Sequence, residues 1–292
     1  MIKSIWFWLK NSRLFSLPMT VLSWLVIFVY STDGNILNGI LALFGISCVH
    51  MATNLFDDYI DYKSLTENCQ KCKCAYIKEG KATIEDVLKV VITYISIAAV
   101  IGLILFIRCG FPVIYMALTG LLISLFYSKL SEYGFSEVAV GIAFGPLFFE
   151  GVYFVMTGSF SFEVFIMSLA VVFFTIGLMY THTVLDFEGD VKSGKKTLVT
   201  RLDSKQNAIN GIWVVYGLGF LFTVLSSILI KNYFILATFI TLPLIYDLYK
   251  SLKTFQCGDD TKEFYFRLLK ARNIMVLFSL FFTFSIILKF FF

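Results

Sequence analysis

Charged residues are scarce in this sequence. Only 15% of the 292 residues are Asp, Glu, Lys or Arg, whereas a soluble domain of this length carries about 25%. Apolar residues make up 58%, and 33 of them are Phe. A chain with so few charges cannot cover a water-facing surface. The composition therefore excludes a soluble protein and indicates that lipid is the solvent.

Three further absences narrow the class of protein. The net charge of +4 is too small to indicate a nucleic-acid partner. With 4 Pro and no linker rich in Pro, Gly or Ser, the chain is expected to form a single transmembrane domain over residues 1–292. The cysteines lack the even spacing of a secreted disulfide framework and are interpreted as reduced thiols; they are Cys48, Cys69, Cys72, Cys74, Cys109 and Cys257.

Long apolar runs dominate what is present. A membrane-spanning helix needs about 20 mainly apolar residues. By this criterion the sequence predicts an all-α, polytopic membrane protein with nine transmembrane helices. The expected spans are 14–31, 36–57, 85–107, 111–128, 137–157, 163–186, 207–230, 233–250 and 270–291.

The basic residues predict how these helices are oriented. If the nine spans alternate in direction, all but three of the 24 Lys and Arg residues fall on the side that holds the N-terminus. The exceptions are Arg108, Lys231 and Lys289. Cytoplasmic loops carry the excess of positive charge, so the N-terminus and the loops after the even-numbered spans are expected in the cytoplasm of a cell-membrane protein.

An acidic motif ends the second expected span. Asn54, Asp57, Asp58 and Asp61 fall on one stripe of a helix about 100° wide, and Glu67 follows. Carboxylates on one stripe repel each other unless a cation neutralises them. Hard oxygen ligands that leave coordination sites open suit Mg²⁺, which bridges to substrate phosphates. The pattern predicts a magnesium site formed by these residues.

A second acidic motif ends the sixth expected span. His182, Asp186 and Asp190 are spaced by four residues and share a helix face. If the two motifs face each other, two carboxylate clusters would hold two Mg²⁺ ions with a diphosphate between them. Basic side chains of the following loops would bind the remaining phosphate oxygens; these are Lys63, Lys71, Lys73, Lys78, Lys195, Lys196 and Arg201.

Two alternative roles fit parts of this pattern. Each motif would also serve as a polar cap where a helix meets the cytosol, but seven of the 20 acidic residues crowd into these two segments. A cation transporter would place its charges near the bilayer centre on broken helices. Here the acids lie at helix ends before Lys-rich loops, which favours phosphate chemistry.

Three segments carry a resemblance to a known family. Arg13–Pro18 (RLFSLP), Asn54–Lys63 (NLFDDYIDYK) and Asp186–Leu202 (DFEGDVKSGKKTLVTRL) look like the first-helix entry and the two acidic motifs of the UbiA superfamily of intramembrane prenyltransferases. The resemblance implies nine helices around a central cavity and Mg²⁺-dependent transfer of a prenyl group from a prenyl diphosphate. The residues it implies for chemistry are Asp58, Asp61, Asp186 and Asp190.

Two further segments suggest the acceptor. Tyr133–Leu147 and Gly151–Ser159 are similar to the branch that prenylates 1,4-dihydroxy-2-naphthoate in menaquinone synthesis, so an aromatic quinone precursor is expected. The same fold would also serve a different acceptor, such as hydroxybenzoate, a haem, a chlorin or a glycerophosphate.

A last group of residues is expected near the acceptor or along the cavity. They are His182, Tyr59, Tyr127, Tyr153 and Glu137. Tyrosine rings stabilise an allylic cation, and Glu137 would position an acceptor hydroxyl. Helix packing for the histidine, the membrane interface for the tyrosines and a helix N-terminus for Glu137 stay open as alternatives. The loop cysteines 69, 72 and 74 would contribute to a zinc or redox site or be simple thiols.

Overall fold

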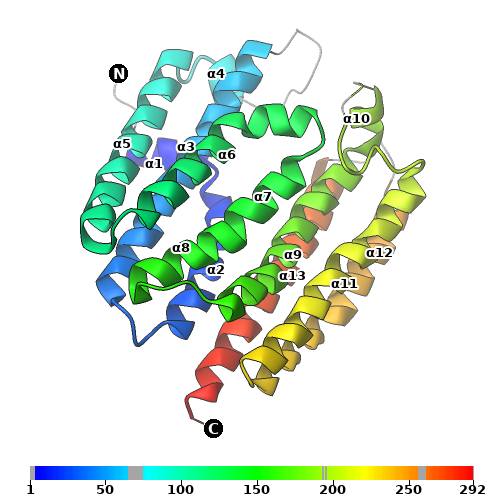
Figure 1. The fold of residues 1–292 in the computed structure, drawn as a ribbon. Coiled ribbons are helices and arrows are strands. Elements are labelled where there is room, and N and C mark those ends of the chain that lie inside the picture. The colour runs from blue at the N-terminus through cyan, green and yellow to red at the C-terminus, as the bar shows by residue number, and fades with distance from the viewer. Residues whose placement is uncertain (1–3, 65–74, 193, 195, 256–260, 292) are drawn as a thin grey trace. The chain divides into compact units, whose positions relative to one another are not determined.

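The computed structural model of this protein describes residues 4–64, 75–192, 194, 196–255 and 261–291. Within these ranges every regular element is a helix, which confirms the all-α class (Figure 1). The chain divides into two compact units. The first comprises residues 1–21 and 36–128, and the second comprises residues 22–35 and 129–292.

The first unit is built on two long helices. Its elements are α1 (Ile5–Asn11), the 3-10 helix η1 (Leu14–Ser16), the start of α2 (Leu17–Tyr30), α3 (Ile36–Ser64), α4 (Ala75–Lys78), α5 (Ile84–Cys109) and most of α6 (Pro112–Glu132). Helices α3 and α5 pack side by side (Figure 1). Leu55 and Val87 from these helices are fully buried, and Tyr76 of α4 packs with them. This core fixes the end of α3 that carries the first acidic motif.

The second unit is organised around its most buried helix. Its elements are the end of α2, the end of α6, α7 (Ser136–Phe144), α8 (Pro146–Thr157), α9 (Phe162–Leu185), α10 (Phe187–Lys192), α11 (Lys205–Leu229), η2 (Tyr233–Thr241), α12 (Leu242–Lys253) and α13 (Thr261–Lys289). Helix α9 packs against α11 and α13 (Figure 1). Phe174 of α9 stacks on Phe278 of α13 with a centroid distance of 3.5 Å.

A glycine allows α9 and α11 to approach closely. A Cβ atom added at Gly177 would lie 2.6 Å from the ring of Tyr216, which is nearer than a real contact permits. Small residues at helix contacts are typical of membrane helix packing, where close backbone approach replaces hydrophobic driving force. The end of α9 that carries the second acidic motif is thereby held to its neighbour.

Among the described residues, seven helices are long and apolar enough to cross a membrane. Helices α1 and α2 would form an eighth span as a pair bent by 56°, while the apolar part of α6, Pro112–Tyr127, is shorter than a full span. The chain is therefore an integral membrane protein, but the expected count of nine spans is not confirmed.

The fifth and ninth expected spans differ from the helices of the structure. The fifth expected span is interrupted between α7 and α8 at Gly145 and Pro146, because proline has no N–H to continue the helical hydrogen bonds. The last helix begins at Thr261 rather than 270. Its charged first turns are tolerated because the buried Arg267 is satisfied by Glu263 and by the Ser251 carbonyl oxygen.

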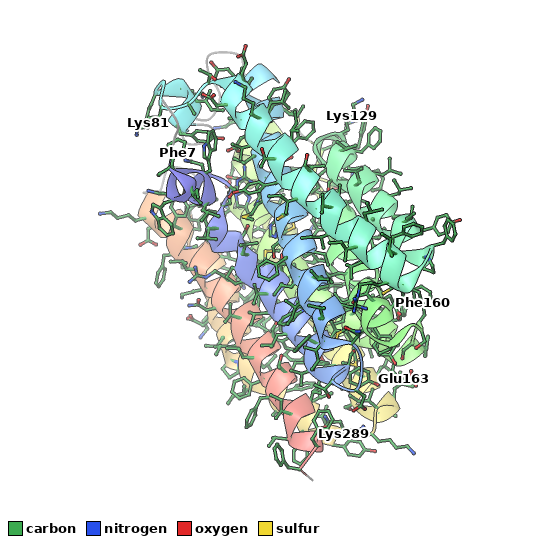
Figure 2. The ribbon with its side chains drawn as sticks, turned by 90° about the vertical axis from the view of Figure 1, so that its left-hand side faces the viewer. Phe7, Lys81, Lys129, Phe160, Glu163 and Lys289 are labelled. Carbon is green, nitrogen blue, oxygen red and sulfur yellow. The ribbon has the colours of Figure 1, made fainter. Side chains whose placement is uncertain are left out.

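The two ends of the second unit can be told apart by their charged residues. Figure 2 shows Lys129 toward one end and Glu163 and Lys289 toward the other. Glu163 lies in the first turn of α9, and Asp186 follows its last residue. Glu163 and the second motif therefore lie at opposite ends of α9.

Candidate active site

The first motif has one deeply buried carboxylate. Asp58 is only 5% exposed. Arg13 donates from Nη2 to its Oδ1 at 2.7 Å, and the Tyr76 hydroxyl donates to its Oδ2 at 3.2 Å. A buried charge is costly unless it is paired and hydrogen-bonded. These two contacts satisfy that requirement and fix the orientation of the carboxylate.

The break between α1 and α2 brings Arg13 to this position. Arg13 adopts the left-handed conformation, with φ 59° and ψ 50°, which is uncommon for a residue with a side chain. Ser12 is fully buried just before it, and Ser16 donates to the Arg13 carbonyl oxygen at 2.8 Å. Sequence reasoning named neither Arg13 nor Tyr76 as a site residue, although RLFSLP drew attention to this segment.

Asn54 lies one turn before Asp58 on α3. Its Nδ2 donates to the Ser12 carbonyl oxygen at 3.0 Å and to Ser16 Oγ at 3.2 Å. Asp57 is half-buried on the same helix. The structure therefore brings Asn54 and Asp58 to the broken segment between α1 and α2.

Several residues of the first motif and its loop lie partly or wholly outside the part of the chain that the structure describes. Asp61 and Lys63 belong to α3, but their side chains lie outside the described part of the chain. Glu67, Lys71 and Lys73, with the loop cysteines, lie outside the described residues altogether. Lys78 ends α4 and is exposed.

The second motif keeps helical spacing across the end of α9. Asp186 caps α9 with its backbone N–H donating to the His182 carbonyl oxygen at 3.1 Å, and the Asp190 N–H donates to the Asp186 carbonyl oxygen at 2.8 Å. The Asp186 carboxylate lies 3.3 Å from His182 Nδ1. Asp190 is only 8% exposed. The backbone hydrogen bonds therefore keep helical i, i+4 spacing from His182 through Asp190.

A lysine outside the motif anchors the same turn. Glu188 lies between the two aspartates and accepts from Lys205 Nζ at 2.6 Å. Lys205 opens α11 and also donates to the Phe255 carbonyl oxygen at 3.1 Å. The turn of the second motif is thus fixed to α11 and to the end of α12. Sequence reasoning did not single out this pair, because nothing in the pattern distinguishes Lys205 from the other loop lysines.

In the basic loop after α10, Arg201 contacts the segment before α7. Arg201 donates to the Tyr133 carbonyl oxygen at 2.6 Å, and its guanidinium lies 5.4 Å from the centroid of the Phe135 ring. Lys196 is exposed, and Lys195 lies outside the described residues. In this structure Arg201 therefore braces the segment before α7.

The residues expected near the acceptor lie at several places. Glu137 is buried in the first turn of α7, where its carboxylate accepts from Ser136 at 2.8 Å and from Thr183 at 3.3 Å. Thr183 is next to His182, whose ring packs edge-on against Phe264. Glu137 is thereby tied to the last turn of α9.

The three expected tyrosines are dispersed. Tyr59 stacks on Phe56 along α3, with a centroid distance of 5.8 Å. Tyr127 is half-buried on α6. Tyr153 pairs with Tyr30 at 6.3 Å near the end of α8, which leads into the Glu163 end of α9.

The donor atoms of the two motifs fit magnesium. Among the described side chains, no three from His, Cys, Asp or Glu gather into a group that would hold a metal ion. Mg²⁺ does not require such a group, because it keeps several waters and binds through one or two carboxylates together with substrate phosphates. The amide and carboxylate oxygens of Asn54, Asp57 and Asp58, and those of Asp186 and Asp190, are ligands of this type.

The chain is similar in sequence to proteins of a known family. A family model described as the UbiA prenyltransferase family matches residues 16–271. The chain is similar to the 1,4-dihydroxy-2-naphthoate octaprenyltransferase of Bacillus subtilis (strain 168), with 23% identity over 187 residues. That alignment covers 59% of this chain, and the chain spans 60% of the length of this relative.

Solved structures share the fold. A UbiA homolog from Archaeoglobus fulgidus bound to GPP and Mg²⁺ superposes with a TM-score of 0.66 at 12% identity, covering 96% of this chain and 99% of the other. A digeranylgeranylglyceryl phosphate synthase superposes with a TM-score of 0.64 at 16% identity, covering 96% of this chain and 97% of the other. At such low identity these likenesses show the fold alone.

Proposed function

The chain belongs to the UbiA prenyltransferase family, and on that premise we propose that it transfers a prenyl group from a prenyl diphosphate to an aromatic acceptor with the help of Mg²⁺. One observation carries the proposal. The matched region, residues 16–271, contains both acidic motifs, and one aspartate of each is buried, Asp58 at 5% and Asp190 at 8% exposure. Acids inside or at the end of a membrane helix are costly and mark function by default.

Each motif has its own part in the proposal. In the first unit Mg²⁺ would be held by Asn54, Asp57, Asp58, Asp61 and Glu67, and in the second by Asp186 and Asp190. When bound, the ion neutralises charge on the diphosphate oxygens and so stabilises the departing group. The acids required for turnover would be Asp58, Asp61, Asp186 and Asp190.

The other side chains would bind, orient and shield the reactants. Diphosphate oxygens would be bound by Lys63, Lys71, Lys73, Lys78, Lys195, Lys196 and Arg201. The C–O bond to the diphosphate breaks and its electron pair stays on the departing diphosphate oxygen. A ring carbon of the acceptor supplies the electron pair of the new C–C bond, and the group it carried leaves as a proton or, from a carboxylate, as carbon dioxide, which restores the aromatic ring. The rings of Tyr59 and Tyr127 would stabilise the allylic cation, and Tyr153 would line the cavity. His182 and Glu137 would contact the acceptor.

The aromatic acceptor is supported by the naphthoate prenyltransferase that aligns with part of this chain. The test uses the purified full-length protein in lipid nanodiscs with labelled geranyl diphosphate and Mg²⁺. The acceptors are 1,4-dihydroxy-2-naphthoate, 4-hydroxybenzoate and glycerol 1-phosphate, each supplied separately. We expect a product that contains the labelled chain and the naphthalene ring. A product formed only with glycerol 1-phosphate would keep the enzyme class and refute the aromatic acceptor.

We also propose that the N-terminus and both acidic motifs face the cytoplasm of the cell membrane, because the basic residues gather on that side. Single cysteines at positions 10 and 289, introduced in place of Lys10 and Lys289, would be labelled with an impermeant maleimide from each side. Labelling of both positions from the same side would contradict this orientation and the odd number of spans behind it.

A further inference from the structure

A chain of hydrogen bonds links α2 to the first acidic motif. His50 lies one turn before Asn54 on α3, between two hydroxyl groups. Its Nε2 is 3.1 Å from Ser16 Oγ, and its Nδ1 is 2.7 Å from Thr20 Oγ1. Thr20 is fully buried. Both ring nitrogens are engaged, so the plane of the imidazole is fixed.

The direction of each hydrogen bond follows from the protons available. Ser16 has one hydroxyl proton, which it donates to the Arg13 carbonyl oxygen at 2.8 Å. Its Oγ must then accept from His50, so the imidazole carries a proton on Nε2. In neutral imidazole the other nitrogen is an acceptor, and Thr20 donates to it.

The same serine orients the amide of Asn54. Asn54 Nδ2 donates to the Ser12 carbonyl oxygen at 3.0 Å and to Ser16 Oγ at 3.2 Å. A carbonyl oxygen only accepts, so the nitrogen of the amide must face Ser12. With both amide protons used on this side, the Asn54 Oδ1 is turned away from residues 12–16.

We propose that His50 is a positioning residue of the first motif: through Ser16 it holds the Asn54 amide so that Oδ1 is presented to the metal. The serine hydroxyl that His50 orients also bonds to the backbone of Arg13, whose guanidinium holds Asp58. One imidazole therefore supports two residues of the motif. This inference rests on the proposed function, because Asn54 is a metal ligand only if that function holds.

The test compares two replacements of similar size in the full-length protein. His50→Gln keeps an N–H donor near the position of Nε2, whereas His50→Leu fills the space without one. The measurement is the dissociation constant for Mn²⁺ in the presence of inorganic diphosphate, followed by electron paramagnetic resonance. We expect His50→Leu to weaken Mn²⁺ binding about tenfold and His50→Gln to stay within about threefold of the unchanged protein, as the loss or retention of one oriented hydrogen bond implies.

Two more variants test the role of the Ser16 hydroxyl and the specificity of the effect. Ser16→Ala removes the intermediate hydroxyl and should weaken Mn²⁺ binding as much as His50→Leu. Thr53→Val is the matched control, because the Thr53 hydroxyl bonds only within its own helix, to the Val49 carbonyl oxygen at 2.9 Å, among the contacts described. It should change Mn²⁺ binding by less than about twofold. The thermal unfolding temperature of every variant shows which comparisons are between folded proteins.

The outcomes separate the two proposals. If the unchanged protein binds Mn²⁺ and forms prenylated product while His50→Leu and Ser16→Ala bind Mn²⁺ equally well, the positioning role is refuted and the proposed function stands. Equal loss in His50→Gln and His50→Leu, with unfolding temperatures unchanged, also refutes the role of the donor. An unchanged protein that neither binds Mn²⁺ with diphosphate nor forms product refutes the proposed function, and the positioning role falls with it.

Discussion

The two acidic motifs are held by contacts of different range along the chain. Asp58 in the first motif pairs with Arg13, 45 residues earlier, and with Tyr76, 18 residues later. Asp186 in the second motif lies against His182, four residues earlier on the same helix. The Asp58 carboxylate is therefore positioned by distant parts of its unit, whereas the Asp186 carboxylate has a contact within its own helix and the turn that follows it is anchored by Lys205.

Asp58 and Asp186 also differ in how far their side chains are exposed to solvent. The side chain of Asp58 is 7% exposed, and that of Asp186 is 44% exposed. An exposed ion pair contributes little to stability because water and salt screen it. A buried charge that loses its partner is strongly destabilising. Both aspartates lie at the end of an expected span, but the buried Asp58 needs a charged partner to remain stable and the more exposed Asp186 does not.

The largest effect should come from removing the metal, which acts on both motifs at once. Exhaustive chelation of the purified protein should abolish prenyl transfer, because the charge of the departing diphosphate would no longer be neutralised; the loss should exceed about 1,000-fold. Added Mg²⁺ or Mn²⁺ should restore turnover. Full activity in excess chelator would contradict a metal role for either motif.

The second-largest effect is a loss of stability, which should differ between the two motifs. Arg13→Met leaves the buried Asp58 charge without its cation and should destabilise the protein by about 2 kcal/mol, which is below the value for a fully buried pair because Arg13 is 33% exposed. His182→Leu should cost less than about 1 kcal/mol, since its contact with Asp186 is exposed. Unfolding in mixed detergent micelles measures both.

A double mutant sharpens this result. Adding Asp58→Asn to Arg13→Met removes the buried charge that Arg13 no longer balances, and this should recover much of the lost stability. Equal costs for Arg13→Met and His182→Leu would show that the two motifs do not differ in the support they need.

A smaller effect tests the anchor of the second motif. Lys205→Met leaves Glu188 without its cation and releases the turn between Asp186 and Asp190 from α11. We expect the Mg²⁺ concentration for half-maximal activity to rise about tenfold, because positioning is lost while the ligands remain. The matched variant Lys205→Arg should stay close to the unchanged protein. A Mg²⁺ requirement unaffected by Lys205→Met would show that the local helix end suffices by itself.

The smallest difference is expected between two glycine variants, one of them in the segment that contacts Arg201. Gly134 has φ 76°, and a Cβ atom there would lie 2.4 Å from the Lys196 carbonyl oxygen. Gly158 has φ 80°, and no atom of the described residues lies within 4 Å of the same position. Gly158→Ala should therefore cost about 1 kcal/mol for backbone strain alone, and Gly134→Ala about 1 kcal/mol more. Equal changes in melting temperature for Gly134→Ala and Gly158→Ala would show that the segment around Gly134 moves to fit the methyl group with no further loss of stability.

The fold was predictable from the sequence to the extent that it depends on apolar runs. Every expected span coincides with helical structure, because a run of apolar residues in lipid must satisfy its backbone internally. The bend near Arg13 and the break at Gly145 and Pro146 were missed, since an apolar run with few polar residues does not reveal where its axis turns. Such breaks depend on tertiary contacts, as between Arg13 and Asp58.

The candidate site was predictable where its residues are close in sequence. The acidic stripe of α3 and the spacing of Asp186 and Asp190 follow from helical periodicity. Arg13, Tyr76 and Lys205 contact residues of the motifs across elements, and no local pattern distinguishes them from other polar residues. The metal and substrate roles assigned to the site residues stay predictions.

The turnover of Asp58→Asn and Asp190→Asn at limiting Mg²⁺ shows whether the buried aspartates act in prenyl transfer. Glu163→Gln is the control. Glu163 is at the far end of α9 from the second motif and bonds to the Ser161 hydroxyl at 2.6 Å. If the buried aspartates act in the chemistry, both Asn variants should remain folded and lose at least about 100-fold in activity, while Glu163→Gln stays near normal. Near-normal turnover of Asp58→Asn and Asp190→Asn would contradict the mechanism proposed for this protein.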